Sequence, residues 1–355
     1  MSLGRWIKTE GDSQAERSCK RFSSSGRFVP RKGRDLKMPK NLISVIAPMY
    51  NEEELVLEYC TTTLRVLEQL NEHYNSELVL VNDGSTDNTL EKMRQIRKQY
   101  ENIITIVSLS RNFGLEAAVN AGLLKAAGDA VVVMDADLQD PPALIFEMVK
   151  AWEKGANVVV GSRIERSHDN FFKKVSANLY YKMLKSFSGK LTLEKNAANY
   201  RLLDRKAVNQ LLSLPEVNGT FRVLVPFIGM KTTTVEYARE KRAAGKTKYH
   251  LGSMIRYALN SLTGITVEPL RKIIWTLPLT LLLAVFSIIG MIVSTDVWRV
   301  GFMLSLIISI LFLALFVSIG LIGEYIAQIM IEVKGRPSAI IYEYLPCENV
   351  KKGEL

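Results

Sequence analysis

The chain is poor in cysteine and histidine. It has three residues of each type among 355, and Cys19, Cys60 and Cys347 lie far apart, without the paired spacing of a metal site. This pattern excludes a small disulfide-stapled fold and disfavours a zinc centre. It is typical of a protein from a reducing compartment.

Residues 1–40 lack both apolar periodicity and the apolar core of a secretory signal. They are rich in Ser and Arg, and they contribute +7 of the net charge of +10. The basic character of the chain is therefore mostly that of a tail, which we expect to be disordered, and it does not predict a nucleic-acid partner. A transit-like segment, an expression leader and an upstream start before Met38 are all compatible with this composition.

Between residues 41 and 245, apolar runs rich in β-branched residues alternate with segments of helical periodicity. The apolar runs are residues 42–50, 77–83, 104–110, 130–137 and 156–163. Continuous apolar strands separated by helices are typical of a mostly parallel sheet that is covered by helices on both faces. We therefore expect an α/β domain over residues 41–245.

The last third of the chain contains two long apolar segments, residues 272–294 and 301–323. Lys272 is the only charged residue in the first, and the second has none. Each is long enough to cross about 30 Å of hydrocarbon, whereas a buried core helix would normally show a polar face. The short connector predicts a transmembrane hairpin within residues 270–330. Basic residues flank the pair, so the positive-inside rule predicts that the α/β domain at residues 41–245 and the segment 331–355 are cytoplasmic.

Residues 246–269, which precede this hairpin, have the pattern of an amphipathic helix. Apolar residues recur at helical spacing at Leu251, Met254, Ile255, Ala258, Leu262 and Ile265. We expect this helix to lie in the membrane interface, with basic side chains available for phosphates. A helix packed on the α/β domain is the alternative.

Polar turns follow three of the predicted strands, where parallel sheets bind their ligands. The turns are "APMYNEE" (47–53), "VNDGSTDNT" (81–89) and "DADLQD" (135–140). In the second, Gly84 permits a sharp turn, and Ser85, Thr86 or Asp87 can cap a helix whose N-terminus favours anions. Each turn alone could be an ordinary connection, but three at strand ends predict a shared site.

The third turn places Asp135, Asp137 and Asp140 within six residues. Carboxylates that close repel one another unless a positive group lies among them. Carboxylate and amide oxygens suit Mg²⁺ or Mn²⁺, and Mg²⁺ usually shares its coordination shell with substrate phosphates. We therefore predict that Asp135, Asp137 and Gln139 bind a divalent ion that carries a diphosphate. A solvated acidic turn is the alternative.

The motifs "YNEE", "VNDGSTDNT", "SLSRNFGLEAAVNAG" and "DADLQDPP", in this order, resemble the GT-A type inverting glycosyltransferases of family 2. The later segments "REKRAAGKTKYHLGSMIRYALNSL" and "GEYIAQIMIEVKGRP" are similar to the polyprenyl-phosphate glycosyltransferases. These include dolichol-phosphate mannosyltransferases and, with two terminal spans, bacterial bactoprenol glucosyltransferases of the GtrB type. The resemblance covers roughly residues 40–345. It implies a Rossmann-like GT-A sheet followed by a two-helix transmembrane hairpin.

The resemblance also implies roles for individual residues. Those that contact the nucleotide would be Pro48, Tyr50, Glu52, Asp83, Asp135 and Ala136. The catalytic set would be Asp137, Arg163, Ser176, Arg201, Arg242 and Lys248, in which the cations neutralise the acceptor phosphate and the leaving diphosphate. For Arg201, a surface salt bridge is the alternative.

One position departs from the family pattern. Asn199, in "AANYRLLDR", stands where many relatives have Asp. A lipid monophosphate has a second pKa near 6, so the acceptor arrives ionised and needs positioning and charge neutralisation more than a base. Either the enzyme works without a base, or Asn199 marks an altered site.

The implied activity is inverting transfer of a sugar from a nucleotide-sugar to polyprenyl phosphate, with Mg²⁺ or Mn²⁺, at the cytoplasmic membrane face. UDP-glucose and undecaprenyl phosphate are the first choices. The alternatives are a dolichol-phosphate-mannose-synthase-like enzyme using GDP-mannose, transfer of GlcNAc from UDP-GlcNAc, a polysaccharide-extruding transferase, a flippase and a non-catalytic scaffold. Glycines at 290, 320 and 323 are compatible with a homo-oligomer.

Overall fold

The computed structural model describes residues 40–164, 197–216, 219–238, 270, 276–293 and 297–351. The chain divides into two units, Met1–Pro39 and Lys40–Leu355, and the first lies wholly outside the described residues. Two predictions concern residues outside the described ranges: the disorder of the tail before residue 40, and the interfacial helix at residues 246–269. Ser176, Arg242 and Lys248 also lie outside these ranges.

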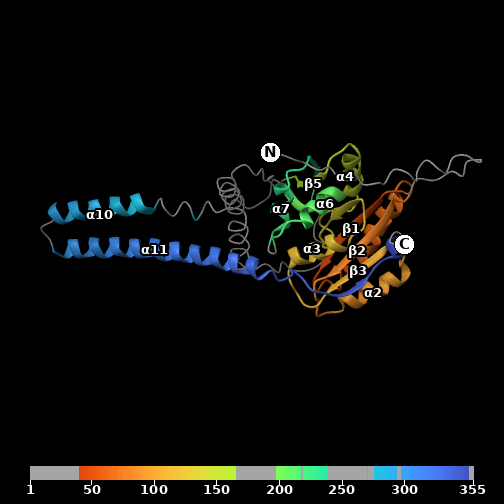
Figure 1. Ribbon diagram of the computed structural model, residues 1–355, viewed down its shortest axis with the longest axis horizontal. Coiled ribbons are helices and arrows are strands. Elements are labelled where there is room, and N and C mark those ends of the chain that lie inside the picture. The colour runs from red at the N-terminus through yellow and green to blue at the C-terminus, as the bar shows by residue number, and fades with distance from the viewer. Residues whose placement is uncertain are drawn as a thin grey trace, which may run out of the picture. The chain divides into compact units, whose positions relative to one another are not determined.

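The α/β domain is built on a sheet (Figure 1). In the described part of the chain this sheet has eight strands, in the order β7-β5-β6-β4-β1-β2-β3-β8. The strands are β1 (Leu42–Met49), β2 (Asn75–Asn82), β3 (Ile104–Leu109), β4 (Ala130–Val133), β5 (Val158–Arg163), β6 (Ala197–Asp204), β7 (Thr232–Tyr237) and β8 (Ile341–Leu345). The four strands β4, β1, β2 and β3 pair in parallel, as does β5 with β7. Strand β6 is antiparallel to both β4 and β5. The sheet is therefore mostly parallel, as predicted.

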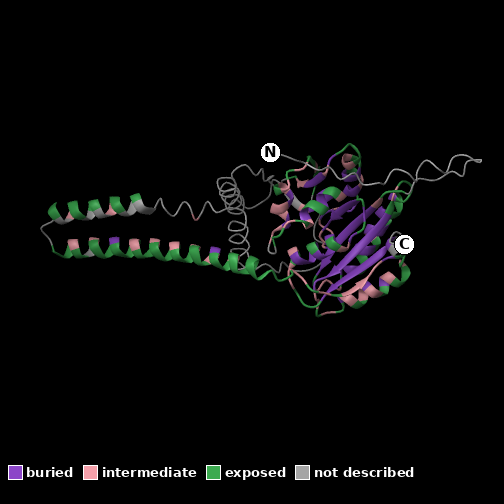
Figure 2. Ribbon diagram, viewed as in Figure 1, coloured by how far each residue is buried: buried purple, intermediate pink, exposed green. Residues whose placement is uncertain are grey.

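Helices cover both faces of the sheet. They are α1 (Val56–Leu70), α2 (Thr89–Gln99), α3 (Leu115–Lys125), α4 (Leu144–Glu153), α6 (Arg205–Leu212) and α7 (Phe221–Phe227). Apolar side chains of α1, α2 and α4 pack with one face, and those of α3, α6 and α7 pack with the other. Figure 2 shows the resulting buried strands between helices whose outer surfaces are exposed. Burial on both faces explains why the strands read as continuous apolar runs.

The apolar runs of the sequence correspond to the first five strands, and the last three strands were not predicted. Strand β6 escapes because Arg201 interrupts its apolar pattern, although this arginine is only 2% exposed. Strand β7 is polar and mostly exposed because its only partner in the described part of the chain is β5. Strand β8 lies beyond the long apolar helices, where no further sheet element was expected.

Two apolar helices lie side by side near the end of the chain, α10 (Thr276–Val293) and α11 (Val297–Lys334) (Figure 1). Among the described residues, α11 alone is long and apolar enough to cross a membrane. Helix α10 contains only a shorter apolar stretch, Leu281–Gly290, which is not long enough to count as a membrane span. The helices contact closely, since a Cβ at Gly290 would lie 3.0 Å from Cε of Met303.

After α11 the chain returns to the sheet of the α/β domain. Strand β8 pairs antiparallel with β3, and the short helix α12 (Glu348–Lys351) follows it. Arg94 of α2 forms an ion pair with Glu343 across 2.6 Å, and Cys347 N donates to Thr105 Oγ1 across 3.0 Å. Part of the predicted C-terminal segment 331–355 is therefore a strand that covers the β3 edge, where exposed backbone groups would otherwise invite aggregation.

Candidate active site

The first two polar turns follow neighbouring strands, β1 and β2, and hydrogen bonds join them directly. Asn51 N donates to Ser85 Oγ across 3.0 Å, and Thr86 N donates to Asn51 Oδ1 across 2.8 Å. Asn51 adopts a left-handed backbone conformation, with φ of 53°. The predicted convergence of these two turns is thus present in the structure.

Asp87 is the residue whose side chain accepts a hydrogen bond from the first turn of α2. Its Oδ1 accepts from Thr89 N across 3.0 Å, and its Oδ2 accepts from Glu53 N across 3.3 Å. Burial alone would raise the pKa of Asp87, but hydrogen bonds from Thr89 and Glu53 hold this pKa below its usual value. The charged carboxylate therefore stabilises both turns. Ser85 and Thr86, the other candidate caps, contact Asn51 instead.

Asp83 is buried at the end of β2, and both of its oxygens accept hydrogen bonds from the loop after β3. Phe113 N donates to Oδ1 across 2.8 Å, while Asn112 Nδ2 and Gly114 N each donate to Oδ2 across 3.0 Å. Burial raises the pKa of Asp83, and the N–H groups of Phe113 and Gly114 together with the charge of Arg111 offset only part of that effect. Asp83 therefore organises the "SRNFG" loop, a role that the sequence analysis did not assign to it.

The third turn follows β4, which pairs with β1 on the side away from β2. Burial raises the pKa of Asp135 to about 6, and the charges of Asp140 and Asp137 add to the rise. Asp137 Oδ1 accepts from Gln139 N across 3.2 Å, and Leu138 between them has a left-handed φ of 55°. The carboxylates are close enough to perturb one another, as their spacing predicted.

Arg163 is the positive group beside Asp140. Its Nη2 lies 3.2 Å from Asp140 Oδ2, and Asp140 is only 1% exposed. Tyr237 also donates to this carboxylate, with OH and Oδ1 2.5 Å apart. Asp140 is thus neutralised within the protein by an arginine that was predicted to contact the acceptor phosphate. That predicted contact stays a prediction.

Asp135 and Asp137 stay the carboxylates that we predict to bind a divalent ion. Across the described ranges, no group of three or more His, Cys, Asp or Glu side chains is arranged to hold a metal. Two hard carboxylates leave room for phosphate oxygens and water, and this donor set fits Mg²⁺ or Mn²⁺ shared with a substrate. It does not fit a metal held by protein ligands alone.

Arg201 lies in the centre of the sheet and not on the surface. It pairs with Val133 of β4, and its Nη1 lies 3.4 Å from the carbonyl oxygens of Phe221 and Arg222. The surface salt bridge considered above is therefore wrong. Two residues earlier on β6, Asn199 has a buried Oδ1 for which the described structure supplies no hydrogen-bond donor.

The remaining predicted residues lie where the turns would place them. Pro48 and Ala136 are buried, Tyr50 is exposed, and Glu52 N donates to Thr89 Oγ1 across 2.9 Å. Tyr237 contacts Asp140 and Arg163 but was not predicted as a site residue, because it lies in no motif of the sequence. Asn112 and Phe113 lay within a quoted motif.

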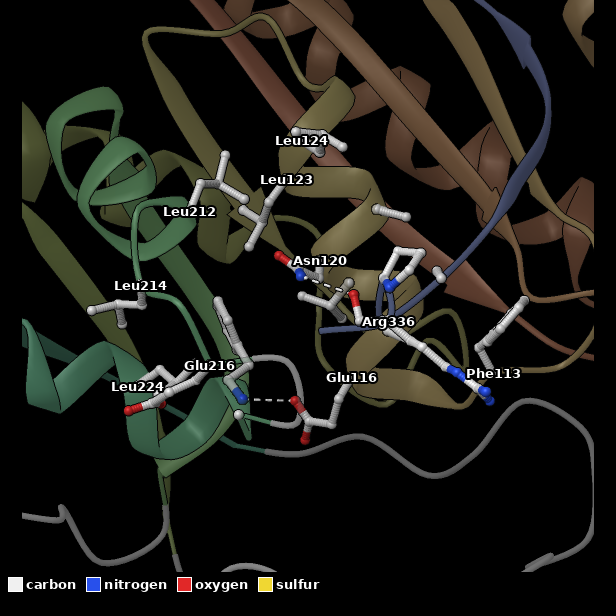
Figure 3. A pocket seen from close by; sticks show the side chains of 18 of the residues that line it. Phe113, Glu116, Asn120, Leu123, Leu124, Leu212, Leu214, Glu216, Leu224 and Arg336 are labelled. Carbon is white, nitrogen blue, oxygen red and sulfur yellow. Dashed lines mark hydrogen bonds between the residues drawn. The ribbon is translucent and has the colours of Figure 1, made fainter. Parts of the chain in front are cut away.

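A cavity of about 870 Å³ lies on the α3 face of the sheet (Figure 3). Apolar side chains of α3, α6 and α7 line it together with residues 331–341. Glu116 Oε2 accepts from Phe221 N across 2.7 Å at its wall, and Asn120 Nδ2 donates to Ser338 Oγ across 3.2 Å. Phe113 lines this cavity, and its backbone N–H donates to Asp83.

Comparison with known proteins agrees with this geometry. Residues 44–212 match the model of glycosyl transferase family 2. An uncharacterised glycosyltransferase of Bacillus subtilis is 37% identical over 310 residues, which are 86% of this chain and 95% of that protein. The chain belongs to glycosyl transferase family 2.

Other relatives of this family 2 glycosyltransferase carry more specific names. A prophage bactoprenol glucosyl transferase homolog of Escherichia coli K12 is 37% identical over 84% of this chain and 98% of its own length. The bactoprenol glucosyl transferase of Shigella phage SfII is 36% identical over 84% of this chain and 97% of its own length. Glucosyl-3-phosphoglycerate synthase of Mycobacterium tuberculosis is 18% identical, with a TM-score of 0.45, over 64% of this chain and 80% of that structure.

Proposed function

We propose that this family 2 glycosyltransferase transfers glucose from UDP-glucose to polyprenyl phosphate, with undecaprenyl phosphate as the acceptor. The observation that carries the proposal is the match to proteins named bactoprenol glucosyl transferase. It covers 84% of this chain and extends well past the family model at residues 44–212. A substrate shared with those proteins would be a membrane lipid.

The proposed reaction is a single displacement. An oxygen of the acceptor phosphate attacks the anomeric carbon, and the bond from that carbon to the diphosphate oxygen breaks. UDP leaves with the bonding electron pair, and the configuration at the anomeric carbon inverts. The phosphate is ionised near neutral pH, so the step needs no general base, and Asn199 is compatible with it.

Each of the three turns would bind a different part of the donor. Asp83 and the turn at residues 48–53 would bind the nucleotide, while Asp135, Asp137 and Gln139 would hold Mg²⁺ or Mn²⁺. When bound, such an ion neutralises charge on the diphosphate. Because two anionic substrates must meet, the site also requires cations. The proposed cations and acceptor contacts are Arg163, Ser176, Arg201, Arg242 and Lys248.

The membrane arrangement is part of the proposal. Helix α11 would span the bilayer together with α10, so that the catalytic domain and β8 share the cytoplasmic side. The long apolar surface of α11 supports this arrangement. The predicted interfacial segment at residues 246–269 would keep the acceptor in the bilayer while its phosphate reaches the turns.

The second function that we retain is a scaffold that kept the fold and lost catalysis. Asn199 favours it, since the family resemblance implies Asp at this position, and its Oδ1 is a buried acceptor without a donor in the described structure. Asp135 and Asp137 weigh against it, because a scaffold has no need for two neighbouring carboxylates in the third turn.

The test uses the full chain in detergent with Mn²⁺ and undecaprenyl phosphate. Radiolabelled UDP-glucose, UDP-GlcNAc and GDP-mannose are supplied separately, and label in the lipid phase is counted. We expect label from UDP-glucose that is lost with EDTA and in Asp137→Asn. Asp129→Asn is the matched control, because Asp129 precedes the opposite end of β4, where its Oδ2 accepts from Leu42 N across 2.8 Å.

Each other outcome has a definite meaning. Label only from GDP-mannose or UDP-GlcNAc would contradict the choice of sugar and retain the reaction. No label from any donor, with rescue by Asn199→Asp, would identify a disabled site. No label in either protein would overturn the proposed activity.

A further inference from the structure

Asp140, Arg163 and Tyr237 form a closed hydrogen-bonded group behind the third turn. Tyr237 OH lies 2.5 Å from Asp140 Oδ1, Arg163 Nε lies 3.2 Å from Tyr237 OH, and Arg163 Nη2 lies 3.2 Å from Asp140 Oδ2. The three residues come from the turn after β4 and from the ends of β5 and β7. We call them the turn clamp.

The clamp holds a residue that does not face the site. Asp140 is 1% exposed, and Tyr237 is 5% exposed with its ring edge-on to Tyr200. Tyr200 OH donates to the carbonyl oxygen of Pro141, the next residue in the turn, across 3.0 Å. The chain just after Asp137 is therefore fixed from three neighbouring strands.

The turn needs such support because it contains a strained residue. Leu138 has a φ of 55°, a conformation that a bulky side chain disfavours, and a protein retains it only where the surroundings enforce it. Leu138 lies between Asp137, whose Oδ1 accepts from Gln139 N, and the clamped Asp140. Releasing Asp140 would let Leu138 relax, and the direction of Asp137 would change with it.

We infer that Tyr237 is a positioning residue of the donor site: through Asp140 and Arg163 it holds the strained turn in the form that aims Asp135 and Asp137 at a metal-bound nucleoside diphosphate. The inference rests on the proposed function for the identity of that ligand. It gives Arg163 a role within the protein, since its guanidinium is already joined to Asp140 and Tyr237.

The test compares Tyr237→Phe with Tyr74→Phe in the full chain in detergent. Both changes remove a hydroxyl that donates to a carboxylate, because Tyr74 OH donates to Glu153, far from the turns. Binding of UDP with Mn²⁺ is measured by calorimetry, and the affinity for Mn²⁺ alone is measured by electron paramagnetic resonance. We expect about tenfold weaker UDP·Mn²⁺ binding in Tyr237→Phe. Tyr74→Phe should bind like the wild type.

A second readout needs no ligand. Amide hydrogen exchange at residues 137–140 reports opening of the turn. Exchange there should be faster in Tyr237→Phe than in the wild type or Tyr74→Phe, while the amides of β1 and β2 stay protected. Unchanged exchange and unchanged binding would overturn the inference. A general rise in exchange over the whole sheet would also overturn it, because that result indicates only lost stability.

A double-mutant cycle tests the part played by strain. In Leu138→Gly the left-handed conformation has little cost, so the clamp has less to hold. We expect Tyr237→Phe to weaken UDP·Mn²⁺ binding less than about threefold in that background. An additive, tenfold effect in both backgrounds would contradict the role of strain. If the wild type binds no nucleotide with Mn²⁺, the proposed donor is wrong, and the exchange experiment still decides the clamp.

Discussion

The backbone N–H of Gly114 donates to Asp83 Oδ2 across 3.0 Å and so ties the loop after β3 to the end of β2. Phe113 N donates a hydrogen bond to the other carboxylate oxygen, Oδ1. In Asp83→Asn one of these oxygens becomes an NH₂ group, and at least one of the two N–H groups loses its acceptor. We expect a loss of about 1–3 kcal/mol in the free energy of unfolding, measured in urea.

The same variant should bind UDP more weakly, because the loop that Asp83 organises adjoins the proposed nucleotide site. Glu91→Gln is the control, since Glu91 is exposed and its contact with Arg94 is a surface pair. Equal stability of Asp83→Asn and the wild type would contradict the role of Asp83 in ordering this loop.

Substitutions at Gly84 and Gly114 can be compared to test how closely the turn after β2 approaches the loop after β3. Both have positive φ, 62° and 96°, which disfavours any other residue. A Cβ at Gly84 would lie 2.1 Å from the carbonyl carbon of Arg111, whereas a Cβ at Gly114 would meet no atom within 4 Å. Gly114→Ala should therefore lose about 1–3 kcal/mol for its backbone conformation alone. Gly84→Ala should lose clearly more.

Thermal and urea unfolding of the two variants check this order. Arg111 belongs to the loop that Asp83 organises, so Gly84→Ala should also weaken UDP binding more than Gly114→Ala. The reverse order of stability would show that the close approach of the two turns is not maintained in solution.

The carboxyl group of Glu116 should make the free energy of unfolding depend on pH. Burial raises its pKa, and the hydrogen bond from Phe221 N and the nearby Arg222 and Arg201 offset burial only in part. The folded state therefore binds this proton more tightly than the unfolded state does. The resulting stability is fully present below the unfolded-state pKa and is lost as the pH rises through the folded-state pKa.

Glu116→Gln removes this titration while keeping an oxygen that can accept from Phe221. We expect the free energy of unfolding of the wild type, relative to Glu116→Gln, to fall over the pH range from the usual pKa of a glutamate, about 4.3, up to the raised pKa of Glu116 in the folded state. Urea unfolding of both proteins over that range measures the difference. A constant difference would mean that Glu116 titrates normally in the folded state.

Cys60 and Cys347 are buried cysteines that form no disulfide bond, and burial raises the pKa of Cys60 to about 12. At pH 8 the thiolate of Cys60 should be present in about one molecule in 10⁴. In Cys19→Ser we expect no rapid reaction of the native protein with a disulfide reagent, and reaction of both thiols in guanidinium. Rapid reaction of the native protein would reveal local opening of α1 or of the segment after β8.

Much of the catalytic domain could be predicted from the sequence by itself. Apolar periodicity is local, and it placed β1–β5 and the helices between them. The convergence of the turns followed from the same pattern, since parallel strands bring their carboxyl ends to one edge. The paired interactions of Asn51 with Ser85 and Thr86 agree with that expectation.

The choice of partners among the charged groups was decided only by the tertiary structure. The sequence showed that the carboxylates at 135–140 needed a cation, but it could not show that Arg163 pairs with Asp140 or that Tyr237 joins them. It also gave no sign that Arg201 is buried in β6. These contacts depend on distances across neighbouring strands that no local pattern encodes.

The edges of the sheet show the same division. Strand β8 lies more than 230 residues after its partner β3, beyond two apolar helices, and its short half-exposed pattern resembles a loop. Local periodicity determined the parallel core and the long apolar helices of this protein. Hydrogen bonding and charge pairing between distant segments, which exist only once the chain has folded, determined the strands that complete the sheet and the groups that hold the third turn.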